Sequence, residues 1–564
     1  MQRFLELLAP EKRVIGFIYL YAVFSGLVSL SLPLGIQSLI GFVSGGQLVT
    51  SVSVLIFFIV IGVLVVGGLQ VMQLSLVEHI QQRIFAKKAF EFTTRITQIK
   101  SDQLAVQNLP ELMNRFFDVI SLQKGLAKML TDFSAAAIQI LFGVILLSFY
   151  HPYFIIFGVL MISILVLVLR LTGPKGMKTS LEESKYKYRL VHWLEEVSRA
   201  ITVFKASSQE KLSLEKTDYY TSGYLKARQA HFKVLITQYI GFVGFKTVIT
   251  AALLLMGSLL LVNQEINLGQ FVATEIIIIL IINAVEKLLV KLDVVYDVLT
   301  SLEKLGGVTD LPAEETKEGL LTQSPATHAG ISIQLKNVGY QYAGSRNPTL
   351  QGISLTVEPG QKVCLAGTEQ AGRSTLLQVL AGVLADYEGI VAYNGLSLKE
   401  YDTTVLHEQT GLFLLPGYLF EGSISENLTM GQPGVTLNDV LWALELVELT
   451  DYVQGLPEGL QTVVSSNSST IPASVVQRLA LARSIAKRPK LLLLDNFLPS
   501  VGRAQRERIG RRLLQPEMAW TVIIISNDPF IMQLCHRVVL LQKGHVIREM
   551  EGKELTSDEL TAIS

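Results

Sequence analysis

Six long apolar stretches alternate with polar segments in the first part of the chain. They lie at 14–43, 52–80, 131–150, 152–172, 234–262 and 268–297. A membrane-spanning helix needs about 20 mostly apolar residues, and each stretch is long enough to provide them. The turn-like sequence FYHPYF separates the third stretch from the fourth. The pattern therefore predicts a membrane domain of six helices.

Lysine and arginine are distributed unevenly between these stretches. The segments at 44–51, 150–153 and 262–268 contain neither, whereas those at 83–128 and 173–233 are rich in both. Because positively charged segments stay on the cytoplasmic side, we expect both termini and the second half of the chain to be cytoplasmic. The two basic segments also have helical periodicity, so they are predicted to continue the membrane helices beyond the bilayer. Short elements near NLPELMNRFFD and HWLEEVSRAITVFKA are expected at their tips.

Several polar side chains fall inside the predicted spans. They are Gln37, Gln70, Gln73, Gln139, Gln238 and Glu275. The glutamines either line a pathway or bond to neighbouring helices. An acid inside a membrane span is costly and is a candidate functional residue. Glu275 therefore either lines a substrate path or is hydrated near the outer end of its helix.

The composition separates two regions with different solvents. The chain of 564 residues is 50% hydrophobic and only 17% charged, whereas about 25% charged residues is typical of soluble proteins. The apolar excess lies in 1–302, a linker rich in Gly, Pro, Thr and Glu follows at 303–330, and 331–564 has the composition of a soluble domain. The net charge is +0 without a basic stripe, which disfavours nucleic-acid binding. Cys364 and Cys535 are too few for a disulfide framework or a metal-ligand cluster.

The stretch GTEQAGRST at 367–375 nearly matches the phosphate-binding motif G-x-x-x-x-G-K-[ST]. Gly367 and Gly372 have the spacing of the motif, but Arg373 stands in place of the lysine. The run QKVCLAG predicts a strand before the loop, and RSTLLQVLAGVL predicts a helix after it. This context suits the motif, because backbone N–H groups and the helix N-terminus then point at a bound anion. The arginine guanidinium is planar and extended, whereas a lysine ammonium is a compact point charge. Glu369 also adds negative charge to the loop.

The apolar runs PKLLLLDN and WTVIIISND predict two further buried strands, which end near Asp495 and Asn527. Around them, the motifs YQY, GYLFEGSISENLTMG and VQRLALARSIAKRPKLLLLD occur in the order and spacing of the ATP-binding-cassette exporter family. Over essentially its whole length the chain resembles a half-transporter of that family, with six spans followed by one cassette. The resemblance implies an all-α six-helix transmembrane domain followed by an α/β P-loop nucleotide-binding domain.

The resemblance also implies a site for ATP and Mg²⁺ in the second domain. Tyr342 corresponds to the aromatic residue that stacks on adenine, and Ser374 and Asp495 correspond to the positions that hold Mg²⁺. The nucleotide-binding positions are Tyr342, Gly367, Gln370, Gly372, Arg373, Ser374 and Thr375.

Several positions depart from the family pattern. Leu415 replaces the glutamine of the Gln loop, Asn496 the catalytic glutamate and Asn527 the switch histidine, so no catalytic residue is intact. IPASV at 471–475 replaces the signature LSGGQ, and Gln370 replaces a loop glycine. An amide cannot act as a carboxylate base. Because phosphoryl transfer relies on positioning and charge stabilisation, we expect weakened ATP binding and hydrolysis slowed by several powers of ten. Whether the chain is itself an enzyme stays open.

The resemblance suggests a catalytically degenerate exporter subunit. Cassettes of this family pair head to tail, and each site joins the phosphate loop of one chain to the signature of the other. We therefore expect a heterodimer with an active half-transporter rather than a homodimer. One alternative is a non-transporting regulator or scaffold in the membrane. The other is a homodimer driven by a different energy source, with Glu275 as a proton site.

The early stretch SLPLGIQSLIGFVSGGQ resembles secretion-type exporters of Gram-negative bacteria, which work with a periplasmic adaptor and an outer-membrane duct. This likeness suggests a peptide or protein cargo and a place in the bacterial inner membrane, in contact with its lipids. The chain begins directly at the membrane domain, so the cysteine-peptidase domain of some relatives is expected to be absent.

Overall fold

The computed structural model describes residues 2–45, 49–100, 109–207, 211–314, 330–415, 417–464 and 471–552. The chain divides into two compact units, and each is described by itself. The first unit comprises Met1–Ile99 and Val106–Ala313, and the second comprises Lys100–Ala105 and Glu314–Ser564.

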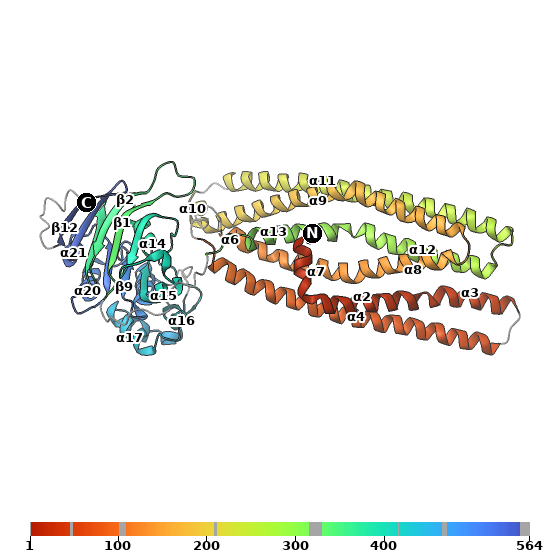
Figure 1. The fold of residues 1–564 in the computed structure, drawn as a ribbon, viewed down its shortest axis with the longest axis horizontal. Helices are drawn as coiled ribbons and strands as arrows, with labels where there is room; N and C mark the ends of the chain where they lie inside the picture. The colour runs from red at the N-terminus through yellow and green to blue at the C-terminus, as the bar shows by residue number, and fades with distance from the viewer. Residues whose placement is uncertain are drawn as a thin grey trace. The chain divides into compact units, whose positions relative to one another are not determined.

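The first unit is built of helices alone within its described residues. They are α1 (Gln2–Leu8), α2 (Lys12–Ser29), α3 (Ser31–Ser44), α4 (Val49–Thr97), α6 (Leu109–Asn114), α7 (Asp118–Lys128), α8 (Ser134–Ser148), α9 (Tyr153–Arg199), α10 (Ile201–Ala206), α11 (Lys211–Val262), α12 (Leu268–Val290) and α13 (Leu292–Thr309). The long helices run side by side, with the short helices α6 and α10 at one end of the unit (Figure 1).

Six spans in the described part of the chain are long and apolar enough to cross a membrane, as predicted. Helices α4, α9 and α11 have 49, 47 and 52 residues, more than twice the roughly 20 that a bilayer requires. The prediction that polar helical extensions continue the spans is therefore confirmed. The short helices α6 and α10 fall within the two sequences that were expected to form tip elements.

The first apolar stretch differs from the prediction, because it forms two helices rather than one. α2 ends at Ser29 and α3 begins at Ser31. Pro33 in the first turn of α3 has no N–H to donate to the preceding turn, and the Ser29 hydroxyl donates to the Gly26 carbonyl at 2.6 Å. The third stretch also begins earlier than predicted, since a π-helix at Met129–Phe133 joins α8 to α7.

The last helix of the unit extends into the segment that was predicted to be a linker. α13 continues to Thr309, although the predicted linker begins at 303. Leu305 and Val308 are buried in an apolar cluster, and this packing outweighs the low helix propensity of the glycines beside them. Most of the predicted linker, 315–329, lies outside the described residues.

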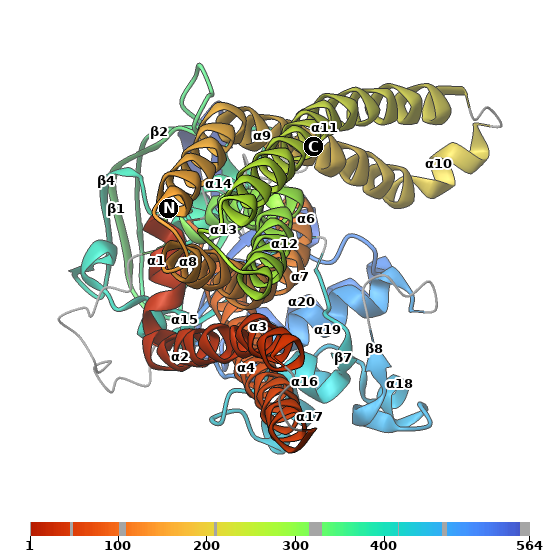
Figure 2. The same ribbon diagram turned by 90° about the vertical axis from the view of Figure 1, so that its right-hand side faces the viewer.

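Two apolar clusters hold the first unit together. One includes Phe154 and Ile277 and joins α8, α9, α11 and α12, while the other includes Ile18 and Leu122 and joins α2, α4, α7 and α13. Figure 2 views the unit along its helices, with α9 beside α11 and α3 beside α4. Many large apolar side chains, such as Leu64, remain exposed on the outside of the unit. Such a surface suits a lipid environment.

The second unit contains two main sheets. An antiparallel sheet has the order β2-β1-β4-β5, and a six-stranded sheet has the order β12-β11-β3-β10-β9-β6, in which only β12 is antiparallel to its neighbour. The strands are β1 (Ile333–Tyr340), β2 (Leu350–Val357), β3 (Lys362–Gly367), β4 (Glu388–Tyr393), β5 (Leu396–Ser397), β6 (Thr410–Phe413), β9 (Leu491–Leu494), β10 (Thr521–Ile525), β11 (Arg537–Gln542) and β12 (His545–Glu551). A short pair, β7 (Gly422–Ser423) and β8 (Val463–Val464), lies apart from them.

The helices of the second unit complete an α/β domain. They are α14 (Arg373–Leu380), α15 (Thr403–Gln409), α16 (Ile424–Thr429), α17 (Leu437–Leu446), α18 (Thr450–Gln454), α19 (Ala473–Ala486), α20 (Arg503–Leu514) and α21 (Pro529–Leu534). The three central strands β3, β9 and β10 are buried along their whole length. Their continuous apolar runs are therefore parallel strands, as predicted. The carboxyl ends of parallel strands meet at one edge of the sheet, where ligands commonly bind.

Candidate nucleotide-binding site

The loop between β3 and α14 has the backbone shape that its two glycines permit. Gly367 has φ +144°, and a Cβ atom there would lie 2.0 Å from the carbonyl oxygen of Leu541. Gly372 has φ +92°, and a Cβ atom there would lie 2.8 Å from the carbonyl oxygen of Thr349. Neither position accepts a side chain. Gly372 is also the N-cap of α14 without any side-chain cap, so the first N–H groups of this helix are free to face an anion.

Gln370 adopts a conformation that favours glycine. Its φ is +62°, in the left-handed region, although it carries an exposed side chain. The left-handed conformation costs an ordinary residue about 1 kcal/mol or more. The loop therefore keeps the backbone path of a phosphate loop at the expense of local strain.

Arg373, the first residue of α14, bonds to a side chain at the end of β10. Its Nη1 donates to Oδ1 of Asn527 at 2.7 Å. The same oxygen accepts the N–H of Gly367 at 3.2 Å, and Nδ2 of Asn527 donates to the Gly367 carbonyl at 3.0 Å. Burial lowers the pKa of Arg373, although the acids around it act in the opposite direction. The Asn527 amide thus ties together the ends of two strands and the start of a helix.

The residue after Asn527 has a different, local role. Asp528 is the N-cap of α21, where its Oδ1 accepts the N–H of Phe530 at 3.0 Å, and its Oδ2 pairs with Arg506 at 2.9 Å. The structure therefore places Asn527, and not Asp528, against the phosphate loop.

Ser374 and Asp495 come together at the edge of the sheet. The Ser374 hydroxyl donates to Oδ1 of Asp495 at 3.1 Å. Burial raises the pKa of Asp495 above its usual value, while the Ser374 hydrogen bond and the charge of Arg373 lower it. A hydroxyl and a carboxylate side by side supply the oxygen ligands that Mg²⁺ prefers, with room for phosphate oxygens and water to complete the shell. The donor set fits the metal expected from the sequence.

Tyr342 lies beside the phosphate loop. Its hydroxyl is 3.2 Å from Oγ1 of Thr375, which is buried in the first turn of α14. Its ring makes an edge contact with Tyr340, at 5.0 Å between centroids. The side chain is therefore held near the loop, where its aromatic ring could stack on the base of a nucleotide.

The loop residues from Gln370 onward and the first turn of α14 border a cavity of about 790 Å³. It is lined by Asn347, Pro348, Thr349, Gln351, Gln370, Ala371, Gly372, Arg373, Ser374, Thr375 and Lys543. A volume of this size suits a nucleotide-sized ligand. Sequence reasoning missed Lys543, which lies far along the chain in the turn between β11 and β12. The only local signal is the dipeptide Lys-Gly between two alternating runs, which is typical of a hairpin.

Of the positions singled out from the sequence, Tyr342, Gly367, Asp495 and Asn527 lie beside the lining residues without lining this cavity themselves. Leu415, Asn496 and Pro472 do not line it either. Leu415 is half-buried and packs against an apolar cluster that includes residues of α19. Asn496 directly follows Asp495, is exposed and has φ +46°. Pro472 precedes α19 as an N-cap without a side-chain hydrogen bond.

Three of the polar residues predicted inside the spans, Gln37, Gln73 and Gln238, bond to other segments of the first unit. Gln238 on α11 donates to Thr172 at 2.9 Å and to the hydroxyl of Tyr296 at 2.7 Å. Gln73 is buried, with Nε2 3.4 Å from the Ile18 carbonyl. Glu275 is half-buried, and its Oε1 has no hydrogen-bond partner within the described part of the chain. No contact among the described residues assigns Glu275 to a substrate path.

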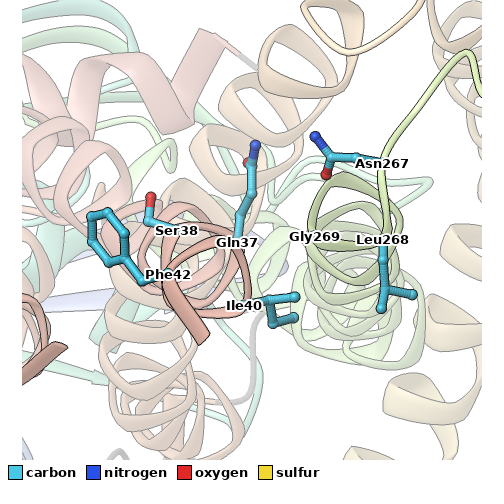
Figure 3. Close-up of a pocket in the computed structure, with 8 residues that line it drawn as sticks. Gln37, Ser38, Ile40, Phe42, Asn267, Leu268 and Gly269 are labelled. Carbon is cyan, nitrogen blue, oxygen red and sulfur yellow. The ribbon is translucent and has the colours of Figure 1, made fainter. Parts of the chain in front are cut away.

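A second cavity, of about 600 Å³, lies between α3 and the start of α12. Figure 3 shows Gln37 extending from α3 and Asn267 at the first turn of α12, with Ile40 and Leu268 nearby. Oε1 of Gln37 accepts the hydroxyl of Tyr150 at 2.5 Å, and Asn267 caps α12 by accepting the N–H of Gln270. These polar groups already have partners within the unit.

Two family models define the class of protein. The model for the ABC transporter transmembrane region matches residues 15–285, and the model for the ABC transporter domain matches residues 350–498. The chain therefore belongs to the ABC transporters, with a transmembrane domain and a nucleotide-binding domain in one polypeptide. The predicted fold class is confirmed, and the second domain is of a kind that binds ATP, generally with Mg²⁺.

The chain is similar to known secretion transporters. It is 23% identical to the lactococcin-A transport/processing ATP-binding protein LcnC of Lactococcus lactis subsp. lactis, over 96% of this chain and 75% of LcnC. It is 27% identical to the alpha-hemolysin translocation ATP-binding protein HlyB of Proteus vulgaris, over 65% of this chain and 51% of HlyB. The structure of a bacterial Atm1-family ABC exporter with ATP bound matches with a TM-score of 0.82 at 15% identity, over 98% of each chain. The chain is thus an integral membrane protein with an ABC exporter fold. ABC exporters act as dimers.

Proposed function

We propose that this chain is a catalytically degenerate subunit of an ABC exporter, which binds ATP weakly and pairs with an active half-transporter. One observation carries the proposal. The Ser374–Asp495 pair that would hold Mg²⁺ is formed, whereas the next residue along the strand end is the amide Asn496.

ATP binding is supported by the cradle around the loop. Gly367 and Gly372 keep the loop path, and the first turn of α14, which has no side-chain cap, borders the cavity, where its N–H groups would suit an anion. Ser374 and Asp495 would hold Mg²⁺, which would neutralise phosphate charge there. Weak rather than tight binding is supported by Arg373, whose guanidinium is engaged by Asn527. A phosphate would have to compete with that bond.

Slow hydrolysis is supported by the chemistry of the side chains near the terminal phosphate position. Asn496 has no lone pair basic enough to accept the proton of an attacking water, because an amide is not a general base. Asn527 cannot take up a proton as a histidine can. Its amide oxygen and its amide nitrogen are both already hydrogen-bonded, to Gly367 and Arg373. The geometry suits holding a nucleotide better than cleaving it.

Pairing with a different, active half-transporter follows from the other face of the domain. In a head-to-tail dimer, the start of α19 would face the nucleotide of the partner chain. That start carries Pro472, which has no N–H to donate, and no side-chain cap. Two copies of this chain would therefore form two poor sites, while an active partner would supply one competent loop and acid.

The remaining parts of the proposal concern location and cargo. We place the protein in a bacterial inner membrane because of its resemblance to secretion-type exporters. The uneven distribution of lysine and arginine supports a cytoplasmic location for both termini and for residues 331–564. The similarity to LcnC and HlyB suggests a peptide or protein cargo. The proposal includes a periplasmic adaptor and an outer-membrane duct as further partners.

The first experiment uses the full chain purified alone in detergent. We expect measurable ATP binding by calorimetry and phosphate release close to background in the presence of Mg²⁺. Asn496→Glu restores the missing base and is expected to raise phosphate release. Brisk Mg²⁺-dependent phosphate release by the wild-type chain would refute the degenerate assignment, whether or not Asn496→Ala abolishes that release.

The second experiment tests pairing. The tagged chain is used to isolate the half-transporter that copurifies with it, and the catalytic acid of that partner is replaced. Loss of nearly all ATPase activity in the complex supports the proposal, whereas retained activity contradicts it. If removal of 331–564 leaves transport in vesicles unchanged, the chain acts instead as a membrane scaffold.

A further inference from the structure

A two-residue turn between β11 and β12 lies against the phosphate loop. Lys543 has φ +47° and Gly544 has φ +80°, and the flanking residues Gln542 and His545 face each other in the ladder. Positive φ at both central positions is the geometry of the tight hairpin turns that fit the twist of two strands. The turn is therefore a defined structure and not a loose loop.

Backbone hydrogen bonds fix this turn to the loop and to β2. The N–H of Gly544 donates to the carbonyl of Ala371 at 3.2 Å, and its own carbonyl accepts the N–H of Gln351 at 2.9 Å. The approach is so close that a Cβ atom at Gly544 would lie 2.6 Å from the carbonyl oxygen of Thr349. The position of Lys543 relative to the phosphate cradle is consequently set by the backbone.

The side chain of Lys543 is exposed and lines the same cavity as 370–375. The described residues include no acid within salt-bridge distance of its ammonium. Among the residues that line the cavity, the charged ones are Arg373 and Lys543, and both are cations. Arg373 is half-buried and bonded to Asn527, whereas Lys543 has a flexible stem and an uncommitted charge. Both charged side chains of the cavity lining are therefore cations, facing the acids Asp495 and Glu369 that lie near Arg373, and the flexible cation comes from the hairpin.

We propose that Lys543 binds the phosphates of the nucleotide and supplies the ammonium that the loop lacks at position 373. An ammonium acts as a compact point charge with three donors, which suits contact with a polyphosphate. The inference rests on the proposed ATP binding in this cavity and adds a binding residue to it.

The test compares ligands that share the nucleoside but differ in phosphate. Calorimetry on the detergent-purified full chain measures the dissociation constants of Mg-ATP and ADP, and competition measures that of adenosine. Lys543→Asn removes the charge and preserves the turn, because asparagine tolerates positive φ. Lys543→Arg keeps the charge. Lys336→Gln on β1, exposed and outside the cavity, is the matched control for a lost surface charge.

We expect Lys543→Asn to weaken ATP binding about tenfold, the size of a lost charge-assisted hydrogen bond. ADP binding is expected to weaken as well, and adenosine binding to stay unchanged. Lys543→Arg retains most of the affinity, and Lys336→Gln behaves as wild type. An unchanged melting temperature in Lys543→Asn shows that the fold is intact.

Two results would overturn the inference while leaving ATP binding in place. One is equal ATP affinity in Lys543→Asn and wild type, and the other is an equal loss for ATP and adenosine. If the wild-type chain binds no ATP at millimolar concentration, the proposed nucleotide site fails, and the role of Lys543 fails with it.

Discussion

Arg373 and Asn527 are joined by a hydrogen bond of 2.7 Å across the phosphate loop. Asn527 is itself held in place by two bonds to the backbone of Gly367. The acceptor therefore cannot move away easily, and the guanidinium is fixed by a rigid partner. A phosphate gains Arg373 as a ligand only when this bond breaks.

Replacing Arg373 by lysine is expected to raise the affinity for ATP. Lysine presents a compact ammonium on a flexible stem, so it exchanges more readily between Asn527 and a phosphate than a planar fork does. The expected gain is about threefold to tenfold, equivalent to roughly 1 kcal/mol. Calorimetry on the purified full chain measures it. Arg373→Gln serves as the control and should weaken binding, and an Arg373→Lys affinity at or below wild type would show that the Asn527 bond does not limit binding.

Binding of ATP is expected to depend on Mg²⁺ through Asp495. The carboxylate binds metal only when it has lost its proton, and burial raises the pKa of Asp495. The Mg²⁺-dependent part of the affinity should therefore be complete at high pH and decline as pH falls through that raised pKa. The decline should begin at a higher pH than for an ordinary aspartate, whose pKa is about 3.9.

Titrations with Mg²⁺ and with EDTA across a pH series measure this dependence. Asp495→Asn should bind ATP equally with and without Mg²⁺ at every pH, and Ser374→Ala should lose part of the Mg²⁺ effect. A Mg²⁺ effect that survives in Asp495→Asn would place the metal elsewhere.

Much of the fold follows from local patterns in the sequence. The runs that end at Leu494 and Ile525 are continuously apolar, and such runs are typical of buried parallel strands. The spacing of Gly367 and Gly372 likewise predicts the loop, because only glycine fits these two backbone positions. The break at Leu30 could not be predicted from hydropathy, since apolar residues continue through both α2 and α3.

The partners of the site residues were harder to predict. The bond between Arg373 and Asn527 joins residues distant in sequence, so no local pattern determines it. Lys543 reaches the site through a hairpin turn whose sequence resembles any other turn, and its place depends on the backbone bond from Gly544 to Ala371. Long-range backbone packing of this kind is visible only in the folded chain.

Gln370→Gly is expected to stabilise the second domain slightly. Gln370 is exposed and has φ +62°, so its side chain contributes strain without buried contacts. Glycine removes about 1–2 kcal/mol of left-handed strain and adds about 0.4–1 kcal/mol of chain entropy to the unfolded state. The net gain is then about 0.5 kcal/mol, visible as a rise of a degree or more in the melting temperature of the purified chain. Glu369→Gly, which relieves no positive φ, should lower the melting temperature, and a drop in both variants would argue against strain at Gln370.

Lys362→Met should destabilise the second domain far more than its position at the start of β3 suggests. The Lys362 side chain is only 1% exposed. Its Nζ donates to the carbonyls of Gly360 at 2.9 Å, Met518 at 2.6 Å and Trp520 at 2.8 Å. An ammonium has three donors, so every one is used. Methionine fills a similar volume but leaves three carbonyls without a donor.

The expected cost of Lys362→Met is about 3 kcal/mol, because unsatisfied buried acceptors each cost on the order of 1 kcal/mol or more. The melting temperature of the second transition in scanning calorimetry of the full chain measures it. Lys336→Met provides the matched control, since Lys336 is an exposed strand lysine of the same domain and its loss should shift the transition little. If both variants melt together with wild type, water must satisfy the three carbonyls in place of Lys362. A large drop in melting temperature confined to Lys362→Met shows that this ammonium joins the start of β3 to the segment before β10. That end of β3 is opposite the end that leads into the phosphate loop.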